Sequence, residues 1–306
     1  MNWVKKGLIW QPNTQLWWQQ HYGILPTPEY LKKEGKIRIY FATTCAQKYG
    51  RISFIEVDAD NPSRILYESP SPILDVGEVG CFDDCGLNPS SILTDEKGNK
   101  WLYYVGYQRS HRVPYMLYAG LAVLYEGQSE WQRWQKTPII DRNAQMPYST
   151  AAPFVLKEQN VYKNWFWVAR NWTTINEKPY LQAYIAYAES SDGQNWQIQP
   201  QPCIEPDWQT EFSVGRPWVL KSEKGYQMWY SLRYVDKLYR LGYAESLDGK
   251  NWQRKDTEVG INVSPTGWDS EMICYPAVLK VKNKLYLFYN GNNNGMTGFG
   301  YAEAEF

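Results

Sequence analysis

The chain repeats one pattern along most of its 306 residues, and this repeat constrains the fold more than any other feature. Three segments each carry Pro-x-Val-Leu-Lys, a polar turn, an aromatic strand, a variable loop and a strand that ends in Tyr-Ala-Glu. Their prolines, Pro153, Pro217 and Pro276, are 64 and 59 residues apart. Two weaker copies, around "NPSSIL" and "TPEYLK", precede them. Repeats of this kind indicate one supersecondary unit stacked several times.

Each copy consists of short alternating stretches separated by turn signals such as "EKGN" and "SEKG", and helical periodicity is weak. We therefore predict an all-β fold, a five-bladed β-propeller with four-stranded antiparallel blades around a central channel. A long β-sandwich is the alternative, but a sandwich does not repeat one pattern five times.

The prediction makes residues 1–306 a single domain. Its blades lie at approximately 20–75, 83–140, 148–203, 211–262 and 271–306. The last copy has only three strands, so we expect the N-terminal segment "WVKKGLIW" to supply the missing outer strand and close the ring.

Composition narrows the function. Lys plus Arg and Asp plus Glu both number 32, which argues against nucleic acid as a partner because phosphate-backbone binding needs a net basic surface. The 16 Trp and 25 Tyr residues suit sheet packing, and flat rings also suit sugar binding. We expect Trp101, Trp167 and Trp229, inside aromatic strands, to be packing residues.

We expect a cytoplasmic protein without a membrane span, because no apolar run has the length of a signal peptide core or a spanning helix. The five cysteines have no regular spacing, so neither a disulfide framework nor a metal site is predicted. No cofactor is expected, the expected partner is a small carbohydrate, and the sequence leaves the oligomeric state open.

A carboxylate precedes the innermost predicted strand in three of the five units. In a propeller this position lies at one mouth of the central channel. We predict Asp84, Glu211 and Glu271 as the catalytic set and Asp83 as a nearby substrate-binding residue. The same position holds Tyr148 in the third unit and His21 or Tyr22 in the first, and Tyr148 and His21 are predicted to bind substrate.

A second set of polar residues lies mostly at the ends of the following strands. These predicted substrate-binding residues are Arg109, Arg170, Arg216, Arg233 and Asn290. Arginines bind carboxylate and phosphate groups in bidentate fashion, so the set indicates an acidic sugar, a sugar phosphate or a nucleotide sugar.

The repeated Pro-x-Val-Leu units, the Tyr-Ala-Glu-Ser-x-Asp-Gly-x-x-Trp hairpins and the axial carboxylates resemble the five-bladed propeller glycosidases. That group includes arabinanases, β-xylosidases, invertases and levansucrases, with the mannoside phosphorylases as relatives. The segments "CFDDCGLNPSSI" and "GWDSEMICYPAVL" are most similar to a bacterial glycosidase-like group from sugar and polysaccharide biosynthesis gene sets. The resemblance implies a sugar-active pocket with three carboxylates. The glycosidases carry an Asp in the first blade, where this chain has His21, Tyr22 and Gly23.

The chemistry that fits is cleavage or transfer of a glycosidic bond, which needs one carboxyl as acid and another as base or nucleophile. Two alternatives stay open at this point. One is a phosphorylase-type or nucleotide-sugar glycosyltransferase, which the arginines favour. The other is a propeller that binds sugar without catalysis.

Overall fold

The computed structural model describes residues 1–199 and 201–305, and it is built almost wholly of β-strands. The expected all-β class is confirmed. The first ten strands are β1 (Val4–Trp10), β2 (His21–Leu31), β3 (Lys36–Thr44), β4 (Gly50–Asp58), β5 (Ile65–Glu68), β6 (Gly86–Thr94), β7 (Lys100–Arg109), β8 (Tyr115–Leu124), β9 (Gln132–Arg133) and β10 (Thr150–Glu158). The other ten are β11 (Val161–Ile175), β12 (Lys178–Ser190), β13 (Gln197–Ile198), β14 (Glu211–Ser222), β15 (Gly225–Tyr234), β16 (Arg240–Ser246), β17 (Gln253–Arg254), β18 (Cys274–Val281), β19 (Lys284–Asn290) and β20 (Phe299–Glu305).

Helical structure in the described residues is limited to three short turns. They are the 3-10 helices η1 (Lys32–Glu34) and η2 (Asp256–Glu258) and the four-residue helix α1 (Asn292–Gly295). Within the part of the chain that the structure describes, no helix is long and apolar enough to cross a membrane.

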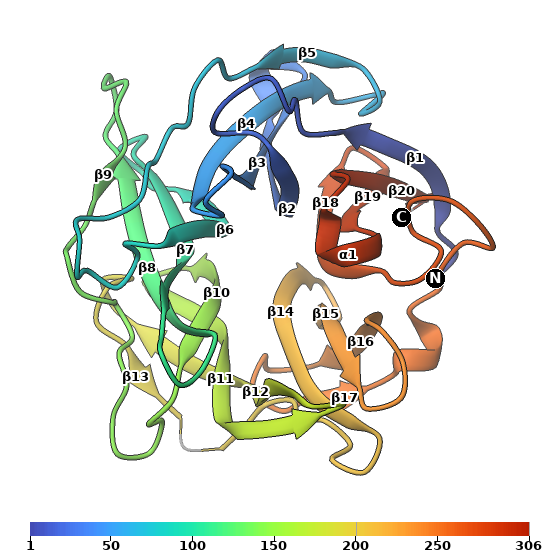
Figure 1. Ribbon diagram of the computed structural model, residues 1–306. Helices are drawn as coiled ribbons and strands as arrows, with labels where there is room; N and C mark the ends of the chain where they lie inside the picture. The colour runs from blue at the N-terminus through green and yellow to red at the C-terminus, as the bar shows by residue number, and fades with distance from the viewer. Residues whose placement is uncertain (200, 306) are drawn as a thin grey trace.

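The strand pairings fall into five antiparallel groups of four within the described residues. Four groups follow the chain, β2 to β5, β6 to β9, β10 to β13 and β14 to β17, and the fifth joins β18, β19 and β20 to β1 from the start of the chain. In Figure 1 the groups surround a common centre, with β2, β6, β10, β14 and β18 innermost.

The groups are not all separate sheets, which differs from the expected isolated antiparallel blades. Single parallel residue pairs, Gly50 with Gly86 and Ala183 with Ser213, join four of the groups into two eight-stranded sheets. The first pair depends on glycine, because a Cβ on Gly86 would lie 2.5 Å from the Gly50 nitrogen. Neighbouring groups therefore touch through backbone near the centre.

Each innermost strand has a bulge at a proline. Proline has no N–H to donate to a strand ladder, so it is confined to edges and bulges inside sheets. The register shifts include Pro26, Pro153, Pro217 and Pro276, and in β6 the shift follows directly after Pro89, which pairs with Tyr104. In four strands the residue before the proline has a positive φ, a conformation that L-residues rarely adopt: Leu25 (56°), Ala152 (50°), Arg216 (55°) and Tyr275 (56°).

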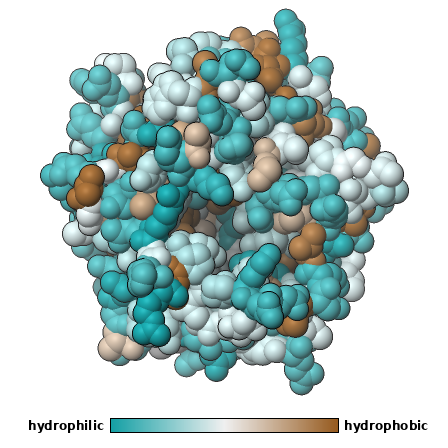
Figure 2. Space-filling view, viewed as in Figure 1, coloured by the Kyte–Doolittle hydropathy of each residue, from teal (hydrophilic) through white to brown (hydrophobic). Residues whose placement is uncertain are grey.

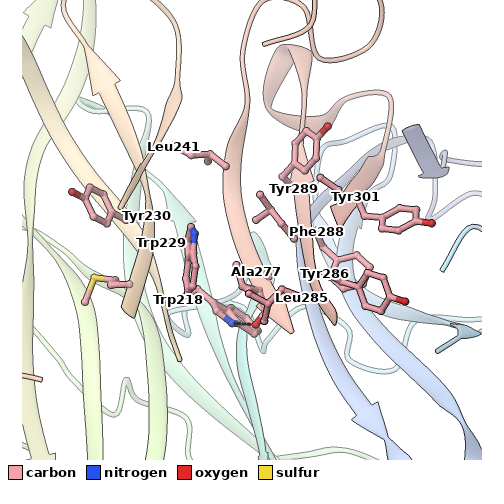
Figure 3. Close-up of a cluster of buried hydrophobic side chains, with 14 of the residues drawn as sticks. Trp218, Trp229, Tyr230, Leu241, Ala277, Leu285, Tyr286, Phe288, Tyr289 and Tyr301 are labelled. Carbon is pink, nitrogen blue, oxygen red and sulfur yellow. Dashed lines mark hydrogen bonds between the residues drawn. The ribbon is translucent and has the colours of Figure 1, made fainter. Parts of the chain in front are cut away.

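Aromatic side chains fill the space between neighbouring groups. Trp229, predicted to be a packing residue, is fully buried, and Trp167 is 8% exposed, whereas Trp101 is only half-buried. Figure 3 shows Trp218 and Trp229 between the fourth and fifth groups, where the Trp218 indole donates a hydrogen bond to the Val278 carbonyl at 2.6 Å. This packing fixes one group against the next.

The two Asp-Gly hairpins also connect neighbouring groups. The Asp192 carboxylate accepts backbone N–H bonds from Gln194 and Asn195, both at 2.8 Å, and so holds the hairpin tip. The Tyr103 hydroxyl, from the preceding group, donates to the Gly193 carbonyl at 2.9 Å. The second hairpin repeats this arrangement with the Trp165 indole and Gly249, at 2.7 Å. Each hairpin tip therefore ties its strand group to the preceding one, and we call this contact the hairpin latch.

Asn290 closes the ring between the fifth group and the first. Its side-chain oxygen accepts from the Leu25 N–H at 2.9 Å, and its amide nitrogen donates to the carbonyls of Gly23 and Gly298 at 2.6 and 3.0 Å. The residue is fully buried, and its donors and acceptor are occupied by backbone. Asn290 therefore has a structural position, which differs from its predicted role in substrate binding.

The closure predicts a stability effect. We expect Asn290→Ala to lower the free energy of unfolding by roughly 1–3 kcal/mol or more, because a buried N–H and two carbonyls lose their partner. Urea denaturation measures the change. The exposed Asn61→Ala is the matched control and should leave stability within roughly 0.5 kcal/mol of the parent. Equal effects of the two substitutions would contradict this role.

The hairpin latch predicts a pH dependence. Burial acts to raise the pKa of Asp192, but hydrogen bonds from Asn195, Gln194 and Ser190 hold it well below its ordinary value. The unfolded chain therefore takes up the proton first as pH falls, so this stabilisation is present above about pH 4 and is lost progressively below it. We expect melting temperatures from about pH 4.5 to about pH 2.5 to fall less steeply for Asp192→Asn than for the parent. Exposed Asp236→Asn is the control, and parallel profiles for parent and Asp192→Asn would refute the assignment.

Candidate functional site

The innermost strands enclose a cavity of about 810 Å³. Figure 2 shows the face seen in Figure 1 hollowed near its centre. The volume lies within the range of small-molecule sites in proteins. The cavity is lined by Tyr22, Ile24, Leu25, Thr44, Ala46, Gln47, Lys48, Asn88, Val105, Tyr107, Arg109, Pro114, Tyr115, Leu117, Ala151, Ala152, Trp167, Tyr180, Ser213, Gly215, Arg216, Ser231, Arg233, Tyr239, Tyr275 and Asn294.

The residue before each bulge proline lines this cavity in all five groups. These residues are Leu25, Asn88, Ala152, Arg216 and Tyr275. Strained backbone of this kind is concentrated at functional sites in many proteins, so the bulges support this location. These residues could have been found in the sequence, because each directly precedes a proline that defines the repeat. We instead considered the residues just before each inner strand, and of the five residues before the prolines we predicted only Arg216 to bind substrate.

Arg216 is buried near the axis and bonds to groups on the far side. Its guanidinium donates to the Ser90 carbonyl, to the Pro26 carbonyl at 3.3 Å and to the Thr27 hydroxyl at 3.0 Å. The side chain lines the cavity and is 3% exposed. Burial lowers the pKa of Arg216 to about 9, which still leaves it a cation at neutral pH.

Arg233 also lines the cavity, among aromatic rings. Its guanidinium carbon lies 4.9 Å from the Tyr180 ring centroid, 4.6 Å from Phe212 and 4.9 Å from Tyr239. The hydroxyl of Tyr239 lies 3.5 Å from that of Tyr275. Burial raises the pKa of both phenols, so they stay protonated at neutral pH and can donate hydrogen bonds. This side of the cavity is therefore rich in donors.

Arg109 organises the rim. It donates to the carbonyls of Gln47 and Lys48 at 2.5 and 3.0 Å, and the Tyr107 hydroxyl also donates to Lys48, at 3.2 Å. These contacts hold the loop that places the exposed Lys48 at the cavity. Arg109, Arg216 and Arg233 are thus the predicted site residues that the structure brings to one cavity. Tyr22, the alternative to His21 at the first-unit position, also lines the cavity, whereas Lys48 and the other tyrosines of the wall were not predicted.

No Asp or Glu is among the described residues that line the cavity. The predicted residues Asp83, Asp84, Glu211 and Glu271 all lie outside this wall. The expectation that carboxylates gather around the ligand therefore does not match the cavity. Their catalytic role stays a prediction, and their surroundings indicate a different use.

Two buried carboxylates, Asp83 and Asp269, each bind a tyrosine of their group and a cation from the outermost strand of that group. Asp83 accepts from Tyr104 at 2.9 Å and from Arg133, on β9, at 2.7 Å. Asp269 accepts from Tyr289 at 2.9 Å and from Lys5, on β1, at 2.6 Å.

The fourth group uses two carboxylates for the same purpose. Arg254, on β17, donates to both oxygens of Glu211 at 2.8 and 2.9 Å, and it also bonds to Asp256, which accepts from Tyr230 at 2.6 Å. Glu211 accepts a further bond from the Asp207 N–H at 2.9 Å. We call the Asp83, Asp269 and Glu211 sets the rim staples, because each ties the start of an inner strand to the outer strand.

The remaining predicted residues also lie outside the cavity wall. Asp84 is half-buried and accepts from the Gly80 N–H at 2.8 Å, and Glu271 is exposed. Arg170 is exposed, with its guanidinium 5.0 Å from the Trp208 ring. The two others are Tyr148, which packs beside the core around Trp167, and His21, which is half-buried at the start of β2.

Within the described ranges, no group of His, Cys, Asp and Glu has the arrangement of a metal site. The chemistry of the cavity therefore comes from guanidinium, phenol, amide and hydroxyl groups, which bind anions and sugar hydroxyls.

The architecture is that of glycoside hydrolases with a propeller-like all-β fold. A structure described as a glycoside hydrolase superposes with a TM-score of 0.74 at 18% identity, over 99% of this chain and 91% of the other. A structure from work on the GH130 family of mannoside phosphorylases, described as containing glycoside hydrolases that target β-1,2 mannosidic linkages in Candida mannan, gives 0.74 at 12% identity, over 99% and 94%. The α-L-arabinofuranosidase from Lactobacillus brevis gives 0.68 at 13% identity, over 92% and 90%. At these identities the likeness defines the fold.

The particular family follows from the sequence. The chain is 34% identical over 307 residues to the uncharacterized protein Rv1502 of Mycobacterium tuberculosis, across 100% of both chains, and it belongs to the same family as that protein. The protein MT1551 of another strain of this bacterium, also uncharacterized, is similar to the same extent. No family model matches the chain.

Because Glu211 belongs to a rim staple and Glu271 does not, substitution of Glu211 should affect stability far more than substitution of Glu271. We expect Glu211→Gln to lower the free energy of unfolding by roughly 1.5–3 kcal/mol, because it weakens the buried charge-assisted bonds to Arg254. The exposed Glu271→Gln should leave stability within roughly 0.5 kcal/mol of the parent. Chemical denaturation measures both changes. Turnover is measured for the same variants. If Glu271→Gln leaves stability unchanged but lowers turnover of a substrate roughly 10²–10⁴-fold, the prediction that Glu271 is a catalytic residue is correct.

Proposed function

We propose that the five strand groups are the blades of a five-bladed propeller, whose axial cavity binds a carbohydrate with a carboxylate or phosphate group and acts on its glycosidic bond. The observation that carries this proposal is the cavity itself. Three arginines and several tyrosines line about 810 Å³, and no carboxylate is among the described residues of the wall.

The anionic group is argued from charge. A guanidinium presents planar N–H donors that match a carboxylate or a phosphate, and an unpaired buried cation is costly. Arg216 bonds to carbonyls and a hydroxyl, and Arg233 lies among aromatic rings. Neither has a carboxylate in the cavity wall to balance its charge. A bound anion would supply that balance.

The sugar is argued from the remaining wall. Tyr22, Tyr107 and Tyr180 offer flat rings together with hydroxyl groups, and Trp167 adds an indole. Aromatic faces pack against apolar faces of a ligand, while phenols satisfy its polar edges. The similar structures described as glycoside hydrolases support the same ligand class.

The reaction that fits best is transfer to or from phosphate. Hydrolysis requires two carboxyls near the bond, one as acid and one as base or nucleophile. In phosphorolysis a phosphate bound by the arginines is itself the nucleophile. One phosphate oxygen forms the new bond to the anomeric carbon as the bond to the leaving oxygen breaks, and the proton that the phosphate gives up ends on that leaving oxygen. No protein carboxylate is then needed as base or nucleophile.

Sugar binding without turnover is the second candidate, and the absence of Asp and Glu from the described cavity wall favours it. A binding protein needs donors and rings but no acid and base. The two candidates share the ligand and differ in whether the glycosidic bond changes.

The proposal predicts charge-dependent binding. Isothermal titration at fixed ionic strength with glucose, glucuronate and glucose 1-phosphate should show both anionic ligands binding roughly 10–100-fold more tightly than glucose, because hydrogen bonds to charged groups contribute about 1.5–3 kcal/mol. Equal affinities for all three would contradict the proposal.

Turnover separates the two candidates. The protein is incubated with a panel of oligosaccharides with and without inorganic phosphate, and the products are identified by mass spectrometry. Glycosyl phosphates formed only with phosphate indicate phosphorolysis, and free sugars in both conditions indicate hydrolysis. No product from any ligand that binds indicates the binding protein.

A further inference from the structure

A second, smaller cavity adjoins the main one. It has a volume of about 230 Å³ and lies between the β11–β12 hairpin and the loop after β15. Tyr180, Arg233 and Tyr239 line both cavities, so these three residues form the partition between them. We call the smaller cavity the side pocket.

Arg233 is the cation of the partition. Burial alone would lower its pKa, but the phenols of Tyr239, Tyr115 and Tyr275 raise the pKa above its ordinary value, so the group is charged at neutral pH. Three ring centroids lie within 4.9 Å of its guanidinium carbon. The Tyr115 hydroxyl is one oxygen partner of the guanidinium. The ring faces around it stabilise the cation, but they are not the oxygen acceptors that its five N–H groups prefer.

The other two arginines of the main cavity donate their hydrogen bonds mainly to backbone carbonyls. Arg216 donates to Pro26, Thr27 and Ser90, and Arg109 donates to two carbonyls of the rim loop. Among the described residues, Arg233 is the arginine shared by the two cavities. It is therefore the arginine best placed to bind a group that extends from one cavity to the other.

We propose that Arg233 binds the charged linker of a two-part ligand, with a sugar in the main cavity and a second, flat group in the side pocket. This rests on the proposed function and specifies its substrate class. A carboxylate cannot itself link two parts of a molecule and keep its charge, whereas a phosphate can form an ester to a group on each side and stay anionic. Phosphodiester and diphosphate linkages do this, so the ligand class is a sugar joined through phosphate to a ring system.

The side pocket favours a flat, largely uncharged second group. Phe212 and Tyr234 line it together with the shared tyrosines, and the exposed Val235 and Leu238 form part of its rim. Asp236 and Lys237 also line it and add one charge of each sign, so the pocket residues other than Arg233 carry no net charge. Aromatic side chains of this kind stack on nucleobases and similar rings, with roughly 1–3 kcal/mol per base. A nucleoside joined by a diphosphate to a sugar has this combination of parts.

The test compares one-part and two-part ligands by isothermal titration. The probes are glucose 1-phosphate and mannose 1-phosphate, and the uridine, guanosine and adenosine diphosphate derivatives of the same sugars. We expect at least one two-part probe to bind tenfold or more tightly than its matching sugar phosphate. If no two-part probe binds more tightly than its sugar phosphate, the inference is wrong.

Substitutions locate the linker. Arg233→Met should weaken the best two-part probe by tenfold or more, and Arg233→Lys, which keeps the charge, should weaken it less. Leu238→Asp, an exposed change on the rim of the side pocket, should weaken the two-part probe and leave its sugar phosphate unaffected. Arg142→Met is the matched control, because Arg142 is also near a ring, 5.7 Å from Tyr118, but lies outside both cavities.

The outcomes separate the inference from the function on which it rests. If sugar phosphates bind but neither Arg233→Met nor Leu238→Asp changes the affinity for a two-part probe, the linker site is refuted and the proposed function stands. If no anionic sugar binds the parent protein at all, the proposed function fails together with the inference.

Discussion

The proline-centred bulge of the inner strand is the constraint on which the rest of the molecule depends. A positive φ in a residue other than glycine costs roughly 1–3 kcal/mol and persists only where neighbours fix it. Here the neighbours do so through hydrogen bonds. The Leu25 N–H is held by Asn290 and the Tyr275 N–H by the Ser231 hydroxyl, at 2.9 and 2.8 Å. The same hydrogen bonds join adjacent strand groups. They therefore hold the strained bulges in place, connect neighbouring groups of the ring and fix the shape of the cavity.

The rim staples show how a repeat can place charged groups where they serve the fold. Asp83 and Glu211 both lie at or just before the start of an inner strand, and each is bound to a cation from an outer strand. A buried carboxylate without such a partner would be strongly destabilising. The staples therefore hold the carboxylates away from the cavity wall and leave the cations Arg216 and Arg233 without acidic neighbours in that wall.

The sequence predicted the class of fold because a repeat with period-two strands and turn signals requires only local chemistry. Three residues that it predicted to bind substrate, Arg109, Arg216 and Arg233, line the cavity, and their role in binding stays a prediction. The remainder depends on contacts that spacing does not encode. The partner of Asp269 is Lys5, 264 residues away, and nothing local distinguishes this structural carboxylate from a catalytic one. Tyr239 was missed because it lies in a loop whose path only the folded chain defines.

The side chains at the five positions before the bulge prolines make the two sides of the cavity chemically different. The backbone has a similar positive φ at four of them, all but Asn88, so a purely structural requirement at these four would be met by similar side chains. Instead the side chains are apolar at Leu25 and Ala152, an amide at Asn88, a cation at Arg216 and a phenol at Tyr275. Burying the guanidinium of Arg216 costs solvation free energy, as its lowered pKa indicates, and the described wall holds no carboxylate that would offset this cost. In the proposed function a ligand anion would offset this cost, and the side of the ring that holds Arg216 would be the charged end of the site. The partition at Arg233 lies in the same strand group as Arg216, which extends that charged end toward the side pocket.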